Sequence, residues 1–280
     1  MREPAVAGMF YPGTEKELLK ELRGCFRKGP RRDQPGSGDR LVGLVSPHAG
    51  YTYSGPTAAH GFIAVADRGM PQTAVVIGPN HHGMGAPIGV SMEDFKTPLG
   101  VMRSDKELAE AIGLGSDERS HSSEHSMEVQ LPFVQFFDRN VRQVCISMLD
   151  QSKNTSMDLG KRIAGAIRST GRDAVIIASS DFTHCGWNYG YPVPAGQTAG
   201  DFARSRDLPV IEKLLEFDIT GAFRKKSELG TTACGMGPIA AMYAAATELG
   251  AARAALFDYR TSYDVMPASS AVGYASIGLF

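Results

Sequence analysis

The chain alternates short aliphatic runs with longer stretches in which apolar residues recur every three or four positions. Short apolar runs bounded by turn residues are typical of buried strands, and the longer spacing is typical of amphipathic helices. The pattern predicts strands at residues 41–46, 73–78, 86–92, 141–149, 173–178, 252–259 and 271–279. It predicts helices at residues 15–26, 55–66, 104–112, 126–138, 154–168, 198–216 and 235–249. We therefore expect an α/β fold, a single domain over residues 1–280 with a mostly parallel central sheet flanked by helices.

A histidine follows each of the first two predicted strands. His48 stands in Pro-His-Ala-Gly-Tyr after strand 41–46, and His81 stands in Gly-Pro-Asn-His-His-Gly after strand 73–78. The helix between these strands makes a βαβ unit, whose right-handed crossover brings both strand ends to one edge of the sheet. Open α/β sheets bind their ligands at that edge. We therefore expect the two histidines to be neighbours.

A third predicted strand, 173–178, ends in Ser-Ser-Asp-Phe-Thr-His, which contains Asp181 and His184. On the first turn of a helix, residues three apart lie on one face. A carboxylate beside an imidazole orients the ring and raises its basicity, as general acid/base catalysis requires. The motif predicts a catalytic pair, and the alternative is a helix cap at Asp181 with an exposed His184.

Cys234 lies among glycines at the apparent N-terminus of helix 235–249. The helix dipole and free backbone amides favour a thiolate there, which can act as a nucleophile or as a soft metal ligand. With two histidines expected nearby, we favour metal ligation. The alternative is a buried cysteine that only packs.

Several further residues are candidates for the same site. His125 and Glu128 belong to the segment Glu-His-Ser-Met-Glu, where we expect them to line the pocket or contact its ligands. The alternative is that the segment only caps a helix and complements its dipole. His82 and Tyr51 adjoin the two predicted histidine ligands, so we expect them in the pocket as well.

Composition excludes several classes of function. The 280 residues carry a formal net charge of −1, which gives no electrostatic reason to expect a nucleic acid or an anionic membrane as partner. The four cysteines, at positions 25, 145, 185 and 234, form no Cys-x-x-Cys pair, which favours a reducing compartment. The N-terminus has no apolar signal core, and no stretch is apolar enough to span a bilayer. We expect a cytoplasmic protein that binds a small molecule or a peptide.

The chain resembles the Memo family in five motifs that follow one another in order: Pro-His-Ala-Gly-Tyr at 47–51, Gly-Pro-Asn-His-His at 78–82, Glu-His-Ser-Met-Glu at 124–128, Ser-Ser-Asp-Phe-Thr-His at 179–184 and Thr-Ala-Cys-Gly at 232–235. Gly-Met-Phe-Tyr-Pro near the N-terminus and Tyr-Ala-Ser-Ile-Gly near the C-terminus fit as well. The resemblance extends over almost the whole chain.

This resemblance implies a fold similar to the LigB-type, class III extradiol dioxygenases, which hold a non-heme iron at the sheet edge. By position, the two histidine ligands of that superfamily fall on His48 and His81, its carboxylate ligand on Cys234, and its acid/base histidine on His184. Memo-like proteins are associated with reduced iron or copper at this set of residues. Because a thiolate is softer than a carboxylate and can itself be oxidised, the set does not by itself predict ring cleavage.

Our leading hypothesis is a metal-dependent redox enzyme in which His48, His81 and Cys234 hold one Fe(II) or copper ion. His184, oriented by Asp181, would move protons. One alternative is a non-catalytic module that binds a peptide or partner protein in the same cleft, lined by Tyr51, Tyr53, Phe182 and Trp187. Another is a protein that sequesters the metal. Hydrolysis is disfavoured because no Gly-x-Ser-x-Gly elbow is present.

Overall fold

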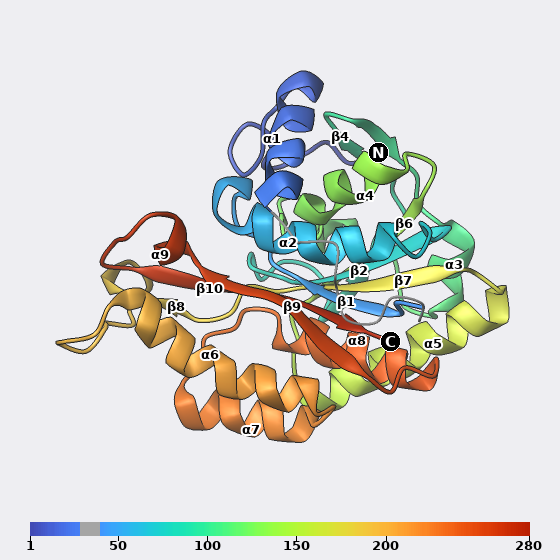
Figure 1. Cartoon of the computed structure of the whole chain (residues 1–280). Helices are drawn as coiled ribbons and strands as arrows, with labels where there is room; N and C mark the ends of the chain where they lie inside the picture. The colour runs from blue at the N-terminus through green and yellow to red at the C-terminus, as the bar shows by residue number, and fades with distance from the viewer. Residues whose placement is uncertain (29–39) are drawn as a thin grey trace.

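The computed structural model describes residues 1–28 and 40–280, and a twisted sheet runs through its middle with helices on both faces (Figure 1). The strand order is β3-β6-β2-β7-β1-β10-β8, and β9 pairs with β10. The strands of this sheet are β1 (Gly43–Ser46), β2 (Thr73–Pro79), β3 (Ile88–Val90), β6 (Arg142–Met148), β7 (Ala174–Ser179), β8 (His184–Cys185), β9 (Ala254–Thr261) and β10 (Ala271–Leu279). The four central strands β6, β2, β7 and β1 are parallel to one another, and the outer strands join them antiparallel. The predicted α/β fold is confirmed.

Helices cover the two faces of the sheet in separate groups. The helices are α1 (Glu15–Lys28), α2 (Tyr51–Ala66), α3 (Lys106–Ala111), α4 (Leu131–Phe137), α5 (Lys153–Thr170), α6 (Ala199–Leu215), α7 (Ile219–Leu229), α8 (Met236–Glu248) and α9 (Ser262–Val265). Helices α1, α2 and α4 pack on one face, and α3, α5, α6, α7 and α8 contribute to the core on the other. A small hairpin of β4 (Phe95–Thr97) and β5 (Gly100–Met102) lies beside the first group.

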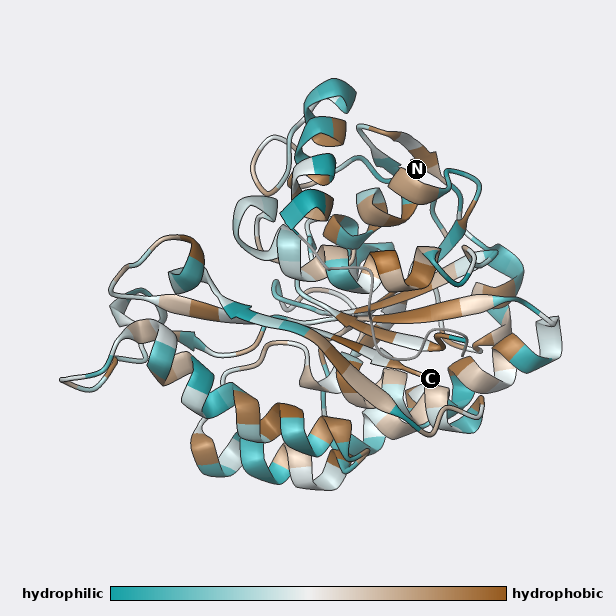
Figure 2. Ribbon diagram, in the orientation of Figure 1, coloured by the Kyte–Doolittle hydropathy of each residue, from teal (hydrophilic) through white to brown (hydrophobic). Residues whose placement is uncertain are grey.

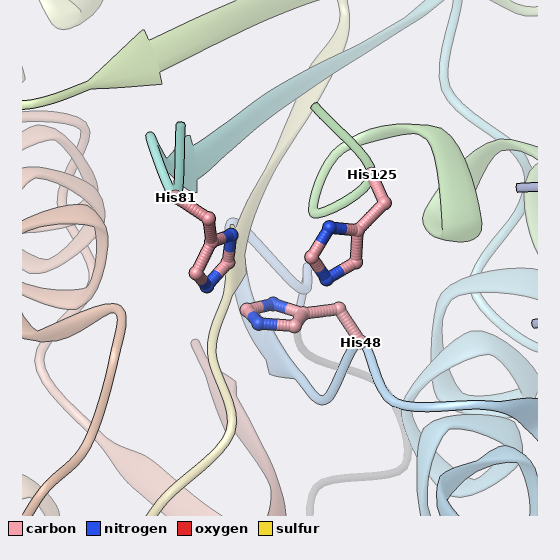
Figure 3. A group of neighbouring side chains, drawn as sticks. All are labelled: His48, His81 and His125. Atoms are coloured by element: carbon pink, nitrogen blue, oxygen red, sulfur yellow. The ribbon is translucent and has the colours of Figure 1, made fainter. Parts of the chain in front are cut away.

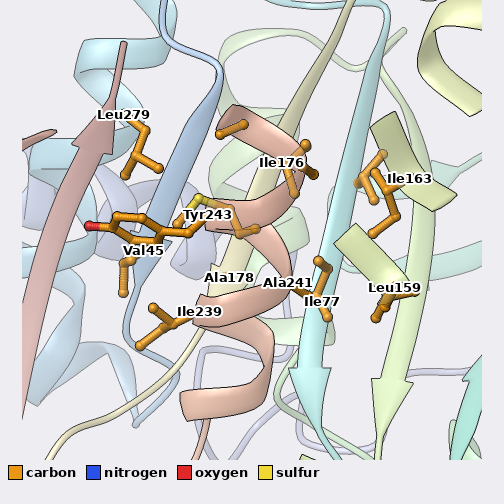
Figure 4. Close-up of a cluster of buried hydrophobic side chains, with 14 of the residues drawn as sticks. Val45, Ile77, Leu159, Ile163, Ile176, Ala178, Ile239, Ala241, Tyr243 and Leu279 are labelled. Atoms are coloured by element: carbon orange, nitrogen blue, oxygen red, sulfur yellow. The ribbon is translucent and has the colours of Figure 1, made fainter. Parts of the chain in front are cut away.

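The central strands are apolar on both sides because both of their faces are covered. Successive side chains of a strand point to opposite faces. Leu44 and Val76 accordingly join the core under α1, α2 and α4, whereas Val45 and Ile77 join the core under α5 and α8 (Figure 4). Hydrophilic residues concentrate on the outward faces of the helices (Figure 2). The apolar runs that predict strands are thus explained by burial between two helical layers.

Four local predictions are wrong or incomplete. Helix α2 begins at Tyr51 rather than at residue 55, so it starts just after His48. The predicted helix 126–138 is a 3₁₀ turn at Glu128–Gln130 followed by the short α4. Residues 180–183 are not helical, and His184 begins the two-residue strand β8. Helix α7 and the β4–β5 hairpin were not predicted. Only residues 216–218 separate α7 from α6, and β4 and β5 have three residues each, too few for an alternation to be recognised.

Among the residues that the structure describes, no helix combines the length and apolar character needed to cross a bilayer.

Candidate metal centre

The carboxyl ends of β1, β2 and β7 lie at one edge of the sheet, because β7 pairs in parallel with both other strands. His48 follows β1 and His81 follows β2, and their ring centroids are 5.2 Å apart. The expected convergence of these two histidines is therefore present. Asp181 and His184 follow β7 and line the same cleft.

A third imidazole completes the group. His125 belongs to the segment that precedes α4. The centroid of its ring lies 5.4 Å from that of His48 and 4.7 Å from that of His81. Figure 3 shows the three rings turned toward one another. Each offers one ring nitrogen such that the three nitrogens lie within 4.8 Å of one another. Imidazole nitrogens at this spacing are suited to hold one transition-metal ion.

A buried carboxylate, Glu124, orients two of these rings. Its Oε1 accepts a hydrogen bond from Nδ1 of His81 at 2.9 Å and lies 3.4 Å from Nδ1 of His125. The backbone amides of His81, His125 and Ser126 also donate to it. Carboxylates that hold the far nitrogen of a metal-binding histidine fix its orientation and raise its basicity. Nε2 of His81 is thereby left as the nitrogen available to a metal.

These contacts stabilise the ionised form of Glu124. Burial acts to raise its pKa, but the hydrogen bonds and charge of His81, together with the backbone amides, outweigh burial and hold the pKa well below its usual range. Glu124 is therefore ionised at neutral pH. The adjacent His125 has its pKa lowered to about 4, first by burial and then by the neighbouring His81, so its ring is neutral and free to bind a metal.

His48 is fixed by a separate network. Its Nδ1 lies 3.0 Å from Oγ of Ser179, which donates its own hydrogen to the carbonyl of Ser126. Because that hydroxyl hydrogen is already used, Ser179 Oγ accepts from His48, which assigns the proton to Nδ1 and leaves Nε2 unprotonated. Gln130 also donates to Ser179 Oγ, at 2.8 Å. Burial, followed by His125 and His81, lowers the pKa of His48 well below its usual range.

Cys234 lies next to His48 but outside the group of three histidines. Its Sγ is 3.2 Å from Nε2 of His48, and it is not among the ligand atoms that lie within 4.8 Å of one another. Burial, and then the carboxylate of Asp181, raise the pKa of this thiol. The sequence predicted a thiolate favoured by the helix dipole. In this structure burial outweighs that dipole, so the metal-free sulfur is protonated.

Asp181 and His184 do not form the predicted hydrogen-bonded pair. Nδ1 of His184 lies 2.9 Å from the carbonyl of Phe182, and the carboxylate of Asp181 accepts from the backbone amide of His48 at 2.8 Å. The prediction assumed a helix, in which residues three apart share a face, but residues 180–183 are not helical. A backbone carbonyl therefore orients His184, and Asp181 holds the loop that carries His48. Burial raises the pKa of Asp181.

Three other residues predicted to line the pocket or to contact its ligands, Tyr51, Glu128 and His82, are not among the residues that line the cleft. Tyr51 is buried in the core under α2, and its hydroxyl donates to the carbonyl of Val129 at 2.7 Å. Glu128 is fully buried and faces the N-terminal segment, where Arg2 binds it at 2.6 Å. His82 is exposed, although it has a ring nitrogen close enough to Glu124 and His125 to form a second candidate group with them.

The cleft in front of the histidines has a volume of about 490 Å³. Aromatic side chains that the sequence analysis did not assign to the site line much of it: Phe10, Tyr189 and Tyr274. Tyr53, which was proposed only for the binding-module alternative, lines it too. A pocket of this size with a few convergent polar groups is typical of a small-molecule site.

Sequence reasoning missed Glu124 as a functional residue. The sequence analysis gave no role to this first residue of the Glu-His-Ser-Met-Glu segment. The ring that it hydrogen-bonds, His81, lies 43 residues away in the chain, so no local spacing signals the contact.

Comparisons with known proteins place the chain among relatives of similar length. A family model described as "Memo-like protein" matches residues 2–278. A MEMO1 family protein of Methanothermobacter thermautotrophicus is 42% identical over 287 residues, which cover 99% of each chain. A MEMO1 family protein of Methanosarcina acetivorans is 43% identical over 283 residues, covering 99% of this chain and 98% of that one.

A solved structure of an uncharacterized Escherichia coli protein is similar in fold. Its TM-score is 0.54 at 15% sequence identity, and the match covers 86% of this chain and 100% of that one. At this identity the likeness supports the α/β fold and carries nothing about function.

Proposed function

The chain belongs to the Memo-like protein family, and we propose that its cleft binds one transition-metal ion, Fe(II) or copper, and uses it for redox or oxygen chemistry on a small molecule. The observation that carries this proposal is the convergence of three imidazoles, His48, His81 and His125, which line a cleft of about 490 Å³. Imidazole is the commonest metal ligand among side chains, and three rings directed at one point are suited to hold one ion.

The donor set fits such an ion. The networks of Ser179 and Glu124 engage Nδ1 of His48 and of His81, so Nε2 is the nitrogen that each ring has left for a metal. Cys234 Sγ lies beside His48 Nε2 and is the further donor that we assign to the ion. Coordination deprotonates a thiol outright, so its raised pKa in the metal-free protein does not oppose this role.

Imidazole and thiolate donors suit iron and copper better than they suit magnesium or calcium. We favour Fe(II), as the family resemblance implies, and copper is the second choice. A bound ion of either kind would supply one-electron redox chemistry and coordination positions for a substrate or oxygen on the side that faces the cleft.

The chain's own residues supply proton transfer and positioning. His184 lines the cleft and gives its Nδ1 hydrogen to the carbonyl of Phe182, so Nε2 is the atom that accepts and returns a proton. The aromatic side chains Tyr53, Tyr189 and Tyr274 exclude water from one side of a bound substrate. This arrangement favours an apolar substrate with one polar group near the histidines.

The proposal is tested by metal analysis of protein purified without oxygen. We expect about one equivalent of iron or copper in the native chain, because one donor group holds one ion. The variant His48→Ala/His81→Ala/Cys234→Ser should lose it. His60→Gln, which removes a buried histidine outside the cleft, is the matched control and should keep the metal. Equal metal content in the native chain and the triple variant would contradict the proposal.

Two exposed apolar side chains, Met266 in the cleft and Trp187 two residues before the cleft residue Tyr189, favour a second candidate function, capture of a peptide. Trp187 is 80% exposed and Met266 is 56% exposed, and Met266 also lines the cleft. Exposed aromatic and apolar residues are typical of interaction sites. Partner binding that survives loss of the metal ligands, without oxygen consumption, would favour this function over catalysis. Tight Cu(I) binding without turnover would instead indicate sequestration.

A further inference from the structure

Residues 1–11, which we call the N-terminal arm, lie next to β4. The backbone amide of Arg2 donates to Asp94 at 2.8 Å, and that of Lys96 donates to the carbonyl of Arg2 at 2.9 Å. These bonds hold the start of the arm against the hairpin. The rest of the arm turns toward the cleft, where Phe10 is one of the lining residues.

The Arg2 side chain is buried, and each of its three guanidinium nitrogens donates a hydrogen bond. Nε donates to the carbonyl of His121 at 2.7 Å, and Nη2 donates to the carbonyl of Glu124 at 2.5 Å. Nη1 donates to the carboxylate of Glu128 at 2.6 Å. All three acceptors belong to one loop, residues 121–128, which also carries His125. The planar guanidinium thus fixes that loop at both ends, which a flexible ammonium group could not do.

Glu128 holds the arm from the other side of the same loop. In addition to the hydrogen bond from Arg2, the carboxylate of Glu128 accepts hydrogen bonds from the backbone amides of Ala5 at 2.7 Å and Val6 at 3.1 Å. It also accepts one from the hydroxyl of Tyr11 at 2.6 Å. A fully buried carboxylate with this many donors is a rigid junction. His125 therefore lies between two points at which the arm and the loop are joined.

Phe10 extends this connection to the metal-binding rings. Its ring packs edge-on against His125, with centroids 4.8 Å apart. Its carbonyl accepts from the amide of Tyr51 at 2.8 Å, at the start of α2 and three residues after His48. The arm thus contacts both the segment that carries His125 and the segment that carries His48.

We propose that Arg2, Glu128 and Phe10 are positioning residues of the metal centre, which hold the loop 121–128 so that the His125 ring faces His48 and His81. This inference rests on the proposed function. It adds that the N-terminal arm, distant in sequence from every predicted ligand, determines the geometry and affinity of the site. Residues that orient metal ligands are worth about 10- to 100-fold in metal affinity.

The test uses the whole chain and Co(II) as the probe. Dissociation constants come from chelator competition, and the visible absorption spectrum reports the ligand geometry. We expect Phe10→Ala and Arg2→Lys to weaken Co(II) binding by about 10- to 100-fold and to change the spectrum. Phe26→Ala removes a partly buried ring that packs against Phe133, away from the cleft, and Glu3→Gln breaks an exposed ion pair of the arm with Lys96. Both controls should keep the native affinity and spectrum.

A second measurement needs no metal. The ring nitrogens of His125, followed by nitrogen-15 NMR in the metal-free protein, should shift and broaden in Phe10→Ala and not in Phe26→Ala. Native affinity, spectrum and ring signals in Phe10→Ala would overturn the inference, even if Arg2→Lys fails to fold. If the native chain binds Co(II) no better than the His48→Ala/His81→Ala/Cys234→Ser variant, the proposed function fails, and the NMR comparison alone decides whether the arm positions His125.

Discussion

The carboxylate of Glu124 accepts a 2.9 Å hydrogen bond from Nδ1 of His81, while its other oxygen accepts from the backbone amide of the same residue at 2.6 Å. One acid thus fixes both the main chain and the ring of a histidine that follows β2. Because the same carboxylate lies 3.4 Å from Nδ1 of His125, it links two of the three imidazoles into one unit. Loss of its charge should therefore disturb the whole site.

Glu124→Gln is expected to weaken metal binding by about 10- to 100-fold, because an amide has one acceptor oxygen and cannot accept from the His81 ring and three backbone amides as the carboxylate does. Metal affinity measured by chelator competition checks this expectation. Glu118→Gln changes a carboxylate that binds Ser91 and Met92 instead, so it should leave the affinity unchanged. Equal affinities for Glu124→Gln and the native chain would show that the carboxylate has only a structural role.

His184→Ala should separate chemistry from binding. Nδ1 of His184 is held by the carbonyl of Phe182, and the ring is not part of the three-histidine group. The variant should therefore keep its metal, while any metal-dependent turnover falls by roughly 10²- to 10⁴-fold, the usual contribution of a positioned proton-transfer group. Metal content and turnover are measured on the same preparation. Loss of the metal would instead make His184 a ligand.

Cys234→Ser tests whether the sulfur joins the ion. With Co(II) bound, a thiolate ligand gives an intense near-ultraviolet charge-transfer band, which a serine cannot give. We expect the native chain to show this band and the variant to lack it, since Sγ lies 3.2 Å from Nε2 of His48. Cys185→Ser is the control and should keep the band. Cys185 is buried, and its sulfur lies within hydrogen-bonding distance of the carbonyls of Ala199 and Ala271. A native spectrum without the band would restrict the ligands to imidazoles.

Asp207 should make stability depend on pH below neutrality. Burial raises its pKa to about 7, even though the amide of Thr183 and the hydroxyl of Tyr259 donate to it. In the unfolded chain an aspartate has a pKa of about 3.9, so between that value and 7 the folded state binds more protons than the unfolded state. The contribution of Asp207 to the free energy of unfolding should therefore fall as pH rises from about 4 to 7, by a few kcal/mol, and level off above that.

Asp207→Asn keeps the shape and removes the titration. Urea unfolding of the native chain and the variant across this pH range measures the difference between them. The variant should lack this contribution, so its stability relative to the native chain should increase with pH. A constant difference between the two proteins would show that Asp207 titrates normally.

The sequence predicted the fold well because its main signal is burial. The central strands are apolar on both faces, and the crossover rule for parallel strands then places His48 and His81 at one edge. What the sequence could not supply is the direction of each side chain. Asp181 and His184 were paired on the assumption of a helix, but the segment is not helical and their side chains contact different partners.

The N-terminal arm shows a second limit of sequence reasoning. Glu128 follows His125 closely in the chain, which suggested a place in the pocket, but its carboxylate binds Arg2 on the opposite side of the loop. Contacts between residues this far apart in sequence leave no periodic pattern. Phe10 reaches the site for the same reason, and only the folded structure reveals it.

The position of the bound ion tests the central claim most directly. Crystals grown without oxygen in the presence of Fe(II), measured at the iron absorption edge, locate the ion by anomalous scattering. We predict one strong peak about 2.0–2.3 Å from Nε2 of both His48 and His81, with His125 and Cys234 completing the ligands. A peak elsewhere, or no peak between these two rings at saturating Fe(II), would contradict the account.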